Sequence, residues 1–416
     1  MRRPVLLVFL AMLSLALVSP LLPYRAIELG ATPFMVGLVM AFDTVMLMFT
    51  AFFWGRLSDR IGRKPMILLA LAVEPAAYAL LAVGDTYTSL LIARGLAGLG
   101  AAAIPVLQAY IADETNNESR TRGMAHFNGA WALAFVVGPL MAYGIGDVTN
   151  DSHVAIAWVA TGVTIIALLL AAVLLRDGKP VVTPLPAGHT PPGPPVEPVP
   201  TTTESQSFAL FDRSGWRALM VRACGLPILA MTLLALVWGQ LEGTVGVWSD
   251  EQLGWGTKDL ALGYLAAGIA GFLTQIWITD RASRDFGLSA VAVTATIAVG
   301  LVLILPVAWP SSWALVAAMT LAGGGAATAN SCYASLFSMA TAPSEQGAVM
   351  GLCHTGINAA WIAGPMMGGF LYAATTPSVP FLVGMVAALL AAILILSFPP
   401  ARRAPQPTTE GAHPNA

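Results

Sequence analysis

Twelve segments of this chain are long and apolar enough to cross the hydrocarbon core of a membrane, which takes about 20 helical residues. They cover residues 5–24, 34–55, 66–84, 88–112, 123–146, 154–175, 219–247, 260–279, 288–308, 313–340, 346–373 and 380–398. Only 10% of the residues are charged, whereas a soluble domain carries about 25%. This excludes a soluble enzyme, a disordered chain and a nucleic-acid-coating protein, because all three need more charge. The sequence predicts an all-α polytopic membrane protein with 12 transmembrane helices, surrounded by membrane lipid.

The basic residues are distributed unevenly between the two sides of the predicted membrane. With the N-terminus inside, 17 of the 20 Lys and Arg lie in inside segments or span rims, Arg94 lies within a span, and only Arg25 and Lys258 lie outside. Because basic loops stay in the cytoplasm, both termini are expected there. The first apolar segment has no small-residue cleavage site, so we expect it to remain as a span. The short loops and the Ala-, Gly- and Pro-rich composition favour a bacterial inner (cytoplasmic) membrane.

A proline-rich segment divides the twelve spans into two groups of six. Residues 177–217 are rich in proline and have no means of burying a core. We therefore predict an N-terminal six-helix bundle over 1–176, a cytoplasmic linker over 177–217, a C-terminal six-helix bundle over 218–400 and a disordered cytoplasmic tail over 401–416. Motifs of the first half recur 221 to 226 residues later, as when Gly138-Pro139 returns as Gly364-Pro365. Two parallel repeats of this kind place the substrate site between them, near the middle of the membrane.

Residues 55–65 read Gly-Arg-Leu-Ser-Asp-Arg-Ile-Gly-Arg-Lys-Pro and lie between the second and third spans. This stretch resembles the signature loop of the major facilitator superfamily, and the resemblance extends to the twelve spans and the 6+6 repeat. It implies that fold, with transport by alternating access. It also implies that Asp59 caps the N-terminus of span 11, where the helix dipole favours a carboxylate, and that Arg63 reaches Asp113. The residues assigned to this gate are Gly55, Asp59, Arg60, Gly62, Arg63 and Asp113. The alternative is that the basic residues only set the orientation.

Two further stretches resemble the drug:proton antiporter branch of that superfamily, which includes multidrug and tetracycline exporters. Arg94 stands in span 4 before Gly95, Gly98 and Gly100, and looks like the buried-arginine motif of the branch. The Gly-Pro pairs at 138–139 and 364–365 look like its antiporter motif, which is more complete in span 11. Close packing of helices through small residues and a local proline kink are the alternatives to a gating role.

Four charged residues lie in predicted spans away from the span ends, where charge is costly and marks a candidate for function. They are Asp43, Glu74, Arg94 and Glu242. Asp43 and Arg94 lie at similar depths and could pair, so we predict Asp43 as the proton-coupling acid and Arg94 as its modulator. Glu242, near the outer end of span 7, could bind a proton or a cationic substrate. A permanent structural pair and a water-reached interfacial Glu242 are the alternatives, and Glu74 is expected to be structural. Many antiporters of the branch carry an acid in span 1, where this chain has none.

Polar and aromatic residues of four spans are candidates for the substrate cavity. They are His126, Asn128 and Trp131 in span 5, Gln240 in span 7, Asn330 and Tyr333 in span 10, and His354, Asn358 and Trp361 in span 11. A histidine within a membrane can relay protons, but it can equally be a hydrogen-bonded contact between helices.

The predicted function is secondary active transport, as a proton-coupled exporter of drug-like amphipathic small molecules. An uptake permease of the same fold and an exporter of one metabolite or siderophore are the alternatives. We expect no cofactor, no metal and no nucleic-acid partner, and the proton gradient as energy source. The chain has no Walker motif, no His-rich metal set and no Gly-x-Ser-x-Gly elbow, so it is not expected to be an enzyme. It is expected to work as a monomer.

Overall fold

The computed structural model describes residues 2–115, 117–149, 152–175, 222–340 and 346–397, and every regular element in these ranges is a helix. The first half contains α1 (Arg2–Val18), α2 (Leu22–Glu28), α3 (Pro33–Ile61), α4 (Arg63–Val83), α5 (Tyr87–Ala101), α6 (Ala103–Asp113), α7 (Asn117–Thr149) and α8 (His153–Leu174). The second half contains α10 (Arg222–Leu253), α11 (Thr257–Leu273), the π-helix η1 (Thr274–Ile278), α12 (Thr279–Phe286), α13 (Leu288–Val302), α14 (Ile304–Ala308), α15 (Ser312–Ala340), α16 (Gln346–Ala374) and α17 (Val379–Leu396). The predicted linker over 177–217 and the tail over 401–416 lie outside the described residues.

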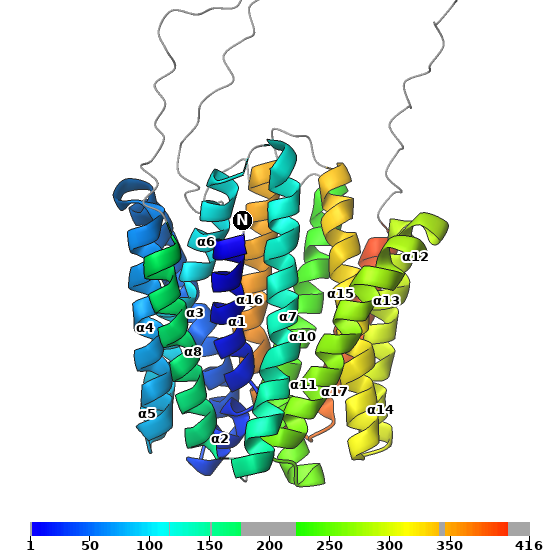
Figure 1. Cartoon of the computed structure of the whole chain (residues 1–416). Helices are drawn as coiled ribbons and strands as arrows, with labels where there is room; N and C mark the ends of the chain where they lie inside the picture. The colour runs from blue at the N-terminus through cyan, green and yellow to red at the C-terminus, as the bar shows by residue number, and fades with distance from the viewer. Residues whose placement is uncertain (1, 116, 150–151, 176–221, 341–345, 398–416) are drawn as a thin grey trace, which may run out of the picture.

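Eleven of the described helical segments are long and apolar enough to cross a membrane. This confirms an all-helical chain built for a membrane, and the helices stand side by side as one bundle (Figure 1). The helix α16 covers residues 346–374, where the eleventh span is predicted, although it is not among those eleven segments. The count of twelve spans and the division into two repeats stay predictions.

Two predicted spans are broken by proline. Pro105 and Pro306 each lie four residues after the last residue of the preceding helix, Ala101 in α5 and Val302 in α13. Because proline has no N–H group, it cannot donate the hydrogen bond that the carbonyl of that last residue would accept. Span 4 is divided at this point into α5 and α6, and span 9 into α13 and α14, whereas Pro75, Pro139, Pro227 and Pro365 stand inside unbroken helices.

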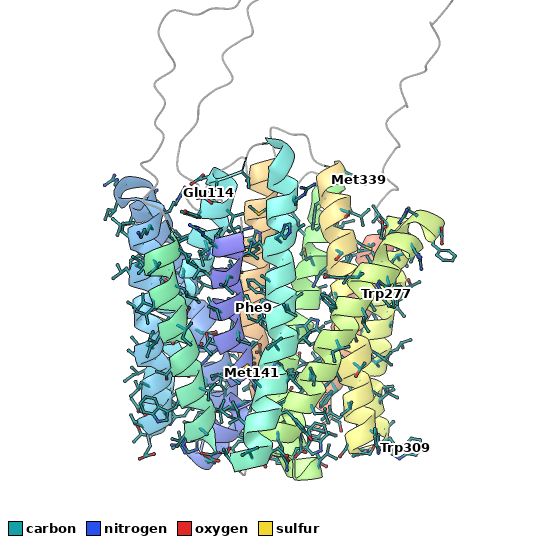
Figure 2. The ribbon with its side chains drawn as sticks, viewed as in Figure 1. Phe9, Glu114, Met141, Trp277, Trp309 and Met339 are labelled. Atoms are coloured by element: carbon teal, nitrogen blue, oxygen red, sulfur yellow. The ribbon has the colours of Figure 1, made fainter. Side chains whose placement is uncertain are left out.

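The outer surface of the bundle is apolar, as a chain surrounded by lipid requires. Large hydrophobic side chains such as Trp277 and Trp309 are 67% and 77% exposed, and both lie on the outside of the bundle (Figure 2). Tryptophan is enriched where a membrane meets water. Exposed side chains of this kind are what a membrane-spanning bundle presents on its outer surface.

The two halves of the chain meet where α3 packs against α16 and α10, where α7 packs against α11, and where α2 packs against α10. At Gly37 a side chain would collide with the backbone carbonyl of Pro365, and at Gly268 with that of Phe135. The absence of a side chain at these glycines therefore lets helices of opposite halves touch backbone to backbone, as small residues do in membranes. We call the face where α1 begins the upper face and the face that carries α2 the lower face (Figure 1).

Candidate transport site

The structure pairs two of the charged residues that the sequence places within spans. Arg94 Nη2 of α5 lies 2.7 Å from Asp43 Oδ2 of α3. Arg94 also donates from Nε to the backbone carbonyl of Val39 at 3.1 Å, and Asp43 Oδ1 accepts the backbone N–H of Thr44 at 2.7 Å. The glycine at Gly98 lets α5 approach, because a side chain there would collide with the backbone of Asp43. The predicted pairing is therefore present, while its role in coupling stays a prediction.

The third predicted coupling residue, Glu242, lies deeper than expected. The helix α10 continues to Leu253, six residues past the predicted end of span 7, so Glu242 lies 11 residues before the end of its helix and not near it. Its Oε1 accepts a hydrogen bond from Ser19 Oγ at 3.4 Å, which joins the two halves. Asp43 and Arg94 lie within electrostatic range of Glu242. The structure thus joins Asp43 to Arg94 directly, whereas Glu242 bonds Ser19 across the interface between the halves.

Glu242 faces a cavity of about 370 Å³ between the halves. This volume is within the range of pockets for small organic ligands, roughly 300 to 1,000 Å³. The aromatic residues that line it are Trp131, Phe135, Trp238, Tyr264, Phe272, Trp361 and Phe381. The polar side chains are Ser19, Glu242, Gln275 and Asn330, and within the described part of the chain Glu242 is the only charged residue of the lining. Such a site suits an aromatic, amphipathic molecule that carries a positive charge.

Three of the predicted cavity residues, Trp131, Asn330 and Trp361, line this cavity. Two others lie elsewhere and correct the sequence-based interpretation. Gln240 is buried and donates from Nε2 to the backbone carbonyl of Pro380, and Tyr333 is buried with its hydroxyl 2.6 Å from Thr296 Oγ1. Both side chains bond neighbouring helices of the second half. A sequence cannot separate the face of a helix that touches its neighbour from the face that lines a cavity.

The remaining predicted cavity residues are not part of this lining. His126 is exposed, and its Nδ1 lies 2.6 Å from the backbone carbonyl of Arg122. Asn128 and His354 are exposed and Asn358 is half-buried. Sequence reasoning missed Trp238 and Tyr264 as lining residues. The available signal was the spacing in α11 and η1, where residues 264, 268, 272 and 275 recur every three or four positions, as one helix face requires.

The predicted contact of the signature loop is present at the upper face. Arg63 Nε donates to Asp113 Oδ2 at 3.0 Å, and Arg63 Nη1 donates to Ser58 Oγ at 2.7 Å. Gly62 joins α3 to α4 with a φ of 107°, a conformation that favours glycine. The side chain of Asp59 is outside the described part of the structure, so its cap on span 11 stays a prediction. Gly55 and Arg60 lie in α3, and the side chain of Arg60 is exposed.

The two Gly-Pro pairs lie where helices pack closely. At Gly138 of α7 a side chain would collide with Ala16 of α1, and at Gly364 of α16 with the backbone of Gln240 in α10. Pro139 lines the cavity, and the carbonyl of Pro365 faces Gly37 across the interface. The packing interpretation of these pairs is therefore supported, and a gating role stays a prediction.

Comparison with known proteins agrees with this architecture. A sequence profile of the Major Facilitator Superfamily matches residues 5–306 and 277–415. The chain belongs to the major facilitator superfamily, and it is a transporter rather than an enzyme.

Two bacterial relatives have names that refer to drug resistance. Multidrug resistance protein 1 of Bacillus subtilis (strain 168) is 25% identical over 281 residues, which cover 67% of this chain and 66% of that protein, just under two thirds of its length. Quinolone resistance protein NorA of Staphylococcus aureus (strain MRSA252) is 24% identical over 367 residues, 88% of each chain.

Solved structures share the fold at low sequence identity. The human organic anion transporter MFSD10 (TETRAN) has a TM-score of 0.63 at 20% identity, over 95% of this chain and 99% of that one. A mutant of the nucleoside transporter NupG has a TM-score of 0.71 at 13% identity, over 94% of this chain and 98% of that one. At these identities the likeness describes the fold alone.

Proposed function

We propose that this protein is a proton-coupled exporter of drug-like, amphipathic cations. It works by alternating access between two six-helix halves, with both termini on the cytoplasmic side of the inner membrane. The observation that carries the proposal is Glu242, the one carboxylate among the described lining residues of an aromatic cavity between the halves. The names of the two bacterial relatives refer to resistance to several drugs and to quinolones, which supports a drug-like substrate. The protein acts as a monomer, without a cofactor.

The coupling follows from competition at one carboxylate. Ionised Glu242 attracts a cation into the aromatic cavity, and a proton that binds the same carboxylate removes that attraction. One site that holds either a proton or a cation, and never both, exchanges the two across the membrane as the halves alternate. No bond other than the one between the proton and the carboxylate is made or broken.

We assign the exchange to Glu242 rather than to Asp43, and the hydrogen bonds of the two carboxylates support this choice. Asp43 already has the Arg94 guanidinium at 2.7 Å and a backbone N–H at 2.7 Å, which hold its negative charge. Among the described residues Glu242 has one long bond, of 3.4 Å from Ser19, so it exchanges partners at lower cost. Asp43 and Arg94 then act on Glu242 through their charges. Asp43 as the coupling acid is the alternative.

Two other functions of the same fold are weighed against this one. A carrier for organic anions needs a basic group in its cavity, and no Lys, Arg or His lines the described cavity. An uptake permease or an exporter of a single metabolite or siderophore differs in direction or in breadth of substrate. The aromatic lining favours broad recognition, because stacking accepts many flat cations.

The test uses proteoliposomes with an acidic interior and a pH-sensitive dye inside. Lipophilic cations, tetracycline and chloramphenicol are added one at a time to wild type, to Glu242→Gln and to Glu251→Gln. Glu251 is an exposed acid of the same helix outside the cavity lining, where it accepts the Tyr372 hydroxyl at 2.5 Å. We expect cations to make the interior alkaline in wild type and in the Glu251 variant but not in Glu242→Gln. Alkalinisation that survives in Glu242→Gln contradicts the mechanism.

A further inference from the structure

The span formed by α11, η1 and α12 contains one turn that is not α-helical. Residues Thr274–Ile278 form a π-helix, and the backbone N–H of Thr279 donates to the carbonyl of Thr274, five residues back. A π turn inserts one residue into an α-helix and is often found at functional sites. This turn lies beside α15.

The π turn keeps a row of hydroxyl groups facing α15. Thr274 Oγ1 donates to the carbonyl of Gly324 at 3.2 Å, and Thr279 Oγ1 lies 3.2 Å from Thr328 Oγ1. In an α-helix with 3.6 residues per turn, two residues five positions apart would point about 140° away from each other. The extra residue returns Thr279 to the face that Thr274 occupies. The contact between the two helices is therefore polar along this stretch.

The same turn places an amide at the cavity wall. Gln275 follows Thr274 directly, is exposed, and lines the cavity. Its Nε2 donates to Ser331 Oγ of α15 at 3.3 Å, which fixes the side chain against that helix. This is the only hydrogen bond that the Gln275 side chain makes within the described ranges, so its amide oxygen and one N–H remain for a ligand.

A second amide lies next to this one in the lining. Asn330 precedes Ser331 in α15, is exposed and lines the same cavity. Its side chain makes no hydrogen bond with any residue that the structure describes. Most of the other lining residues are aromatic or aliphatic. These two amides therefore supply much of the hydrogen-bonding capacity of the cavity lining.

We propose that Gln275 and Asn330 form a recognition subsite for a neutral hydrogen-bonding group of the substrate, such as a carbonyl, an amide or an aromatic amine. The inference rests on the proposed function and adds a second requirement to the charge that Glu242 attracts. A cation with such a group binds both Glu242 and the amides, whereas a cation without one binds through charge and stacking alone. A hydrogen bond of this kind changes affinity about three- to tenfold.

The test compares two cations and three variants in the same proteoliposomes. Tetraphenylphosphonium has no hydrogen-bonding group, and rhodamine 6G carries an ester carbonyl and two amines. Gln275→Met keeps the length of the side chain and removes the amide. Gln108→Met is the matched control, because Gln108 is an exposed glutamine outside the cavity lining. Asn330→Ala tests the second amide independently.

We expect Gln275→Met to raise the KM for rhodamine 6G about three- to tenfold and to leave the KM for tetraphenylphosphonium as in wild type. Asn330→Ala acts in the same direction, and Gln108→Met changes neither value. Unchanged transport of tetraphenylphosphonium also shows that the variant is folded. Equal effects on both cations, or none on either, overturn the subsite while the proposed function stands. If wild type carries neither cation, the proposed function fails, and this subsite fails with it.

Discussion

The guanidinium of Arg94 lies 2.7 Å from the carboxylate of Asp43, and this ion pair joins α5 to α3 within the first half of the chain. The side chain of Arg94 is 6% exposed and that of Asp43 is 18% exposed. Because little water reaches them, each charge is stabilised mainly by the other. Glu242, in the second half, lies within electrostatic range of both. We therefore expect a change at the pair to alter the electrostatic potential at Glu242.

Breaking this pair has a cost that is distinct from its effect on transport. Asp43→Asn leaves Arg94 charged and buried without a counter-ion, and we expect it to lower the free energy of unfolding by about 3 kcal/mol. The double variant with Arg94→Gln removes the unpaired charge and restores part of that loss without restoring transport. Thermal unfolding in detergent measures the first effect and vesicle transport the second. A double variant that regains full transport would mean that the pair is only structural.

Proton competition at Glu242 predicts a pH dependence with a definite sign. More protons on the side from which the substrate enters keep more of the carboxylate neutral, so the KM for a cation rises as the pH there falls. Glu242→Gln has no carboxylate to titrate, and its KM is high and independent of pH. Binding of a fluorescent cation over a pH series checks this. A pH dependence that persists in Glu242→Gln assigns the titration to another group.

Close contact between the halves depends on Gly37. A side chain there would collide with the backbone carbonyl of Pro365, so Gly37→Ala forces α3 and α16 apart at a cost of about 1 to 3 kcal/mol. We expect reduced transport. We also expect faster labelling of a cysteine that replaces Tyr24, because the Tyr24 hydroxyl lies 2.8 Å from Ser249 Oγ across the interface. Gly162→Ala is the control, because no atom lies near the added group. Equal labelling in both variants would contradict the prediction.

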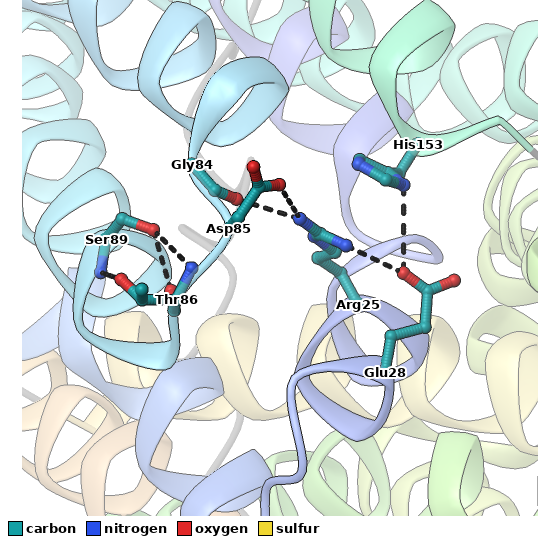
Figure 3. Close-up of polar contacts among 7 residues, drawn as sticks. All are labelled: Arg25, Glu28, Gly84, Asp85, Thr86, Ser89 and His153. Atoms are coloured by element: carbon teal, nitrogen blue, oxygen red, sulfur yellow. Dashed lines mark hydrogen bonds and ion pairs between the residues drawn. The ribbon is translucent and has the colours of Figure 1, made fainter.

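At the lower face Arg25 joins α2 to the turn between α4 and α5, and Glu28 joins α2 to α8 (Figure 3). Arg25 donates to Glu28 at 3.0 Å, to the carbonyl of Gly84 at 2.8 Å and to Asp85 at 3.1 Å, and His153 Nδ1 lies 3.7 Å from Glu28. The Arg25 side chain is 8% exposed and that of Asp85 is 89% exposed. We expect Arg25→Met to cost about 2 kcal/mol and Asp85→Asn to stay close to wild type, because exposed ion pairs contribute little. Thermal unfolding of the two variants side by side measures the difference.

The signature loop gives a prediction about gating at the upper face. Arg63 already contacts Asp113 at 3.0 Å, and Asp59 is predicted to cap span 11 beside it. We expect Asp59→Asn to abolish transport while expression and thermal unfolding stay near wild type. Radioactive substrate uptake into inverted vesicles measures the transport. Full activity of this variant would remove Asp59 from the gate.

The sequence by itself determined the helical membrane fold and the family. It also predicted two ion pairs, Asp43 with Arg94 and Arg63 with Asp113. Hydropathy marks each span because the bilayer sets its length, and the rarity of charge in lipid isolates Asp43, Arg94 and Glu242. The signature loop predicted the contact between Arg63 and Asp113, which the structure confirms.

The tertiary structure decided which face of each helix lines the cavity. Trp131 and Trp361 face it as predicted, whereas Tyr333 is buried against α13 and Tyr264 appears in the lining unpredicted. The rotation of a helix about its axis depends on backbone contacts at particular glycines and on local changes of pitch such as the π turn before Thr279. Those contacts join residues far apart in the sequence, so no local pattern encodes them.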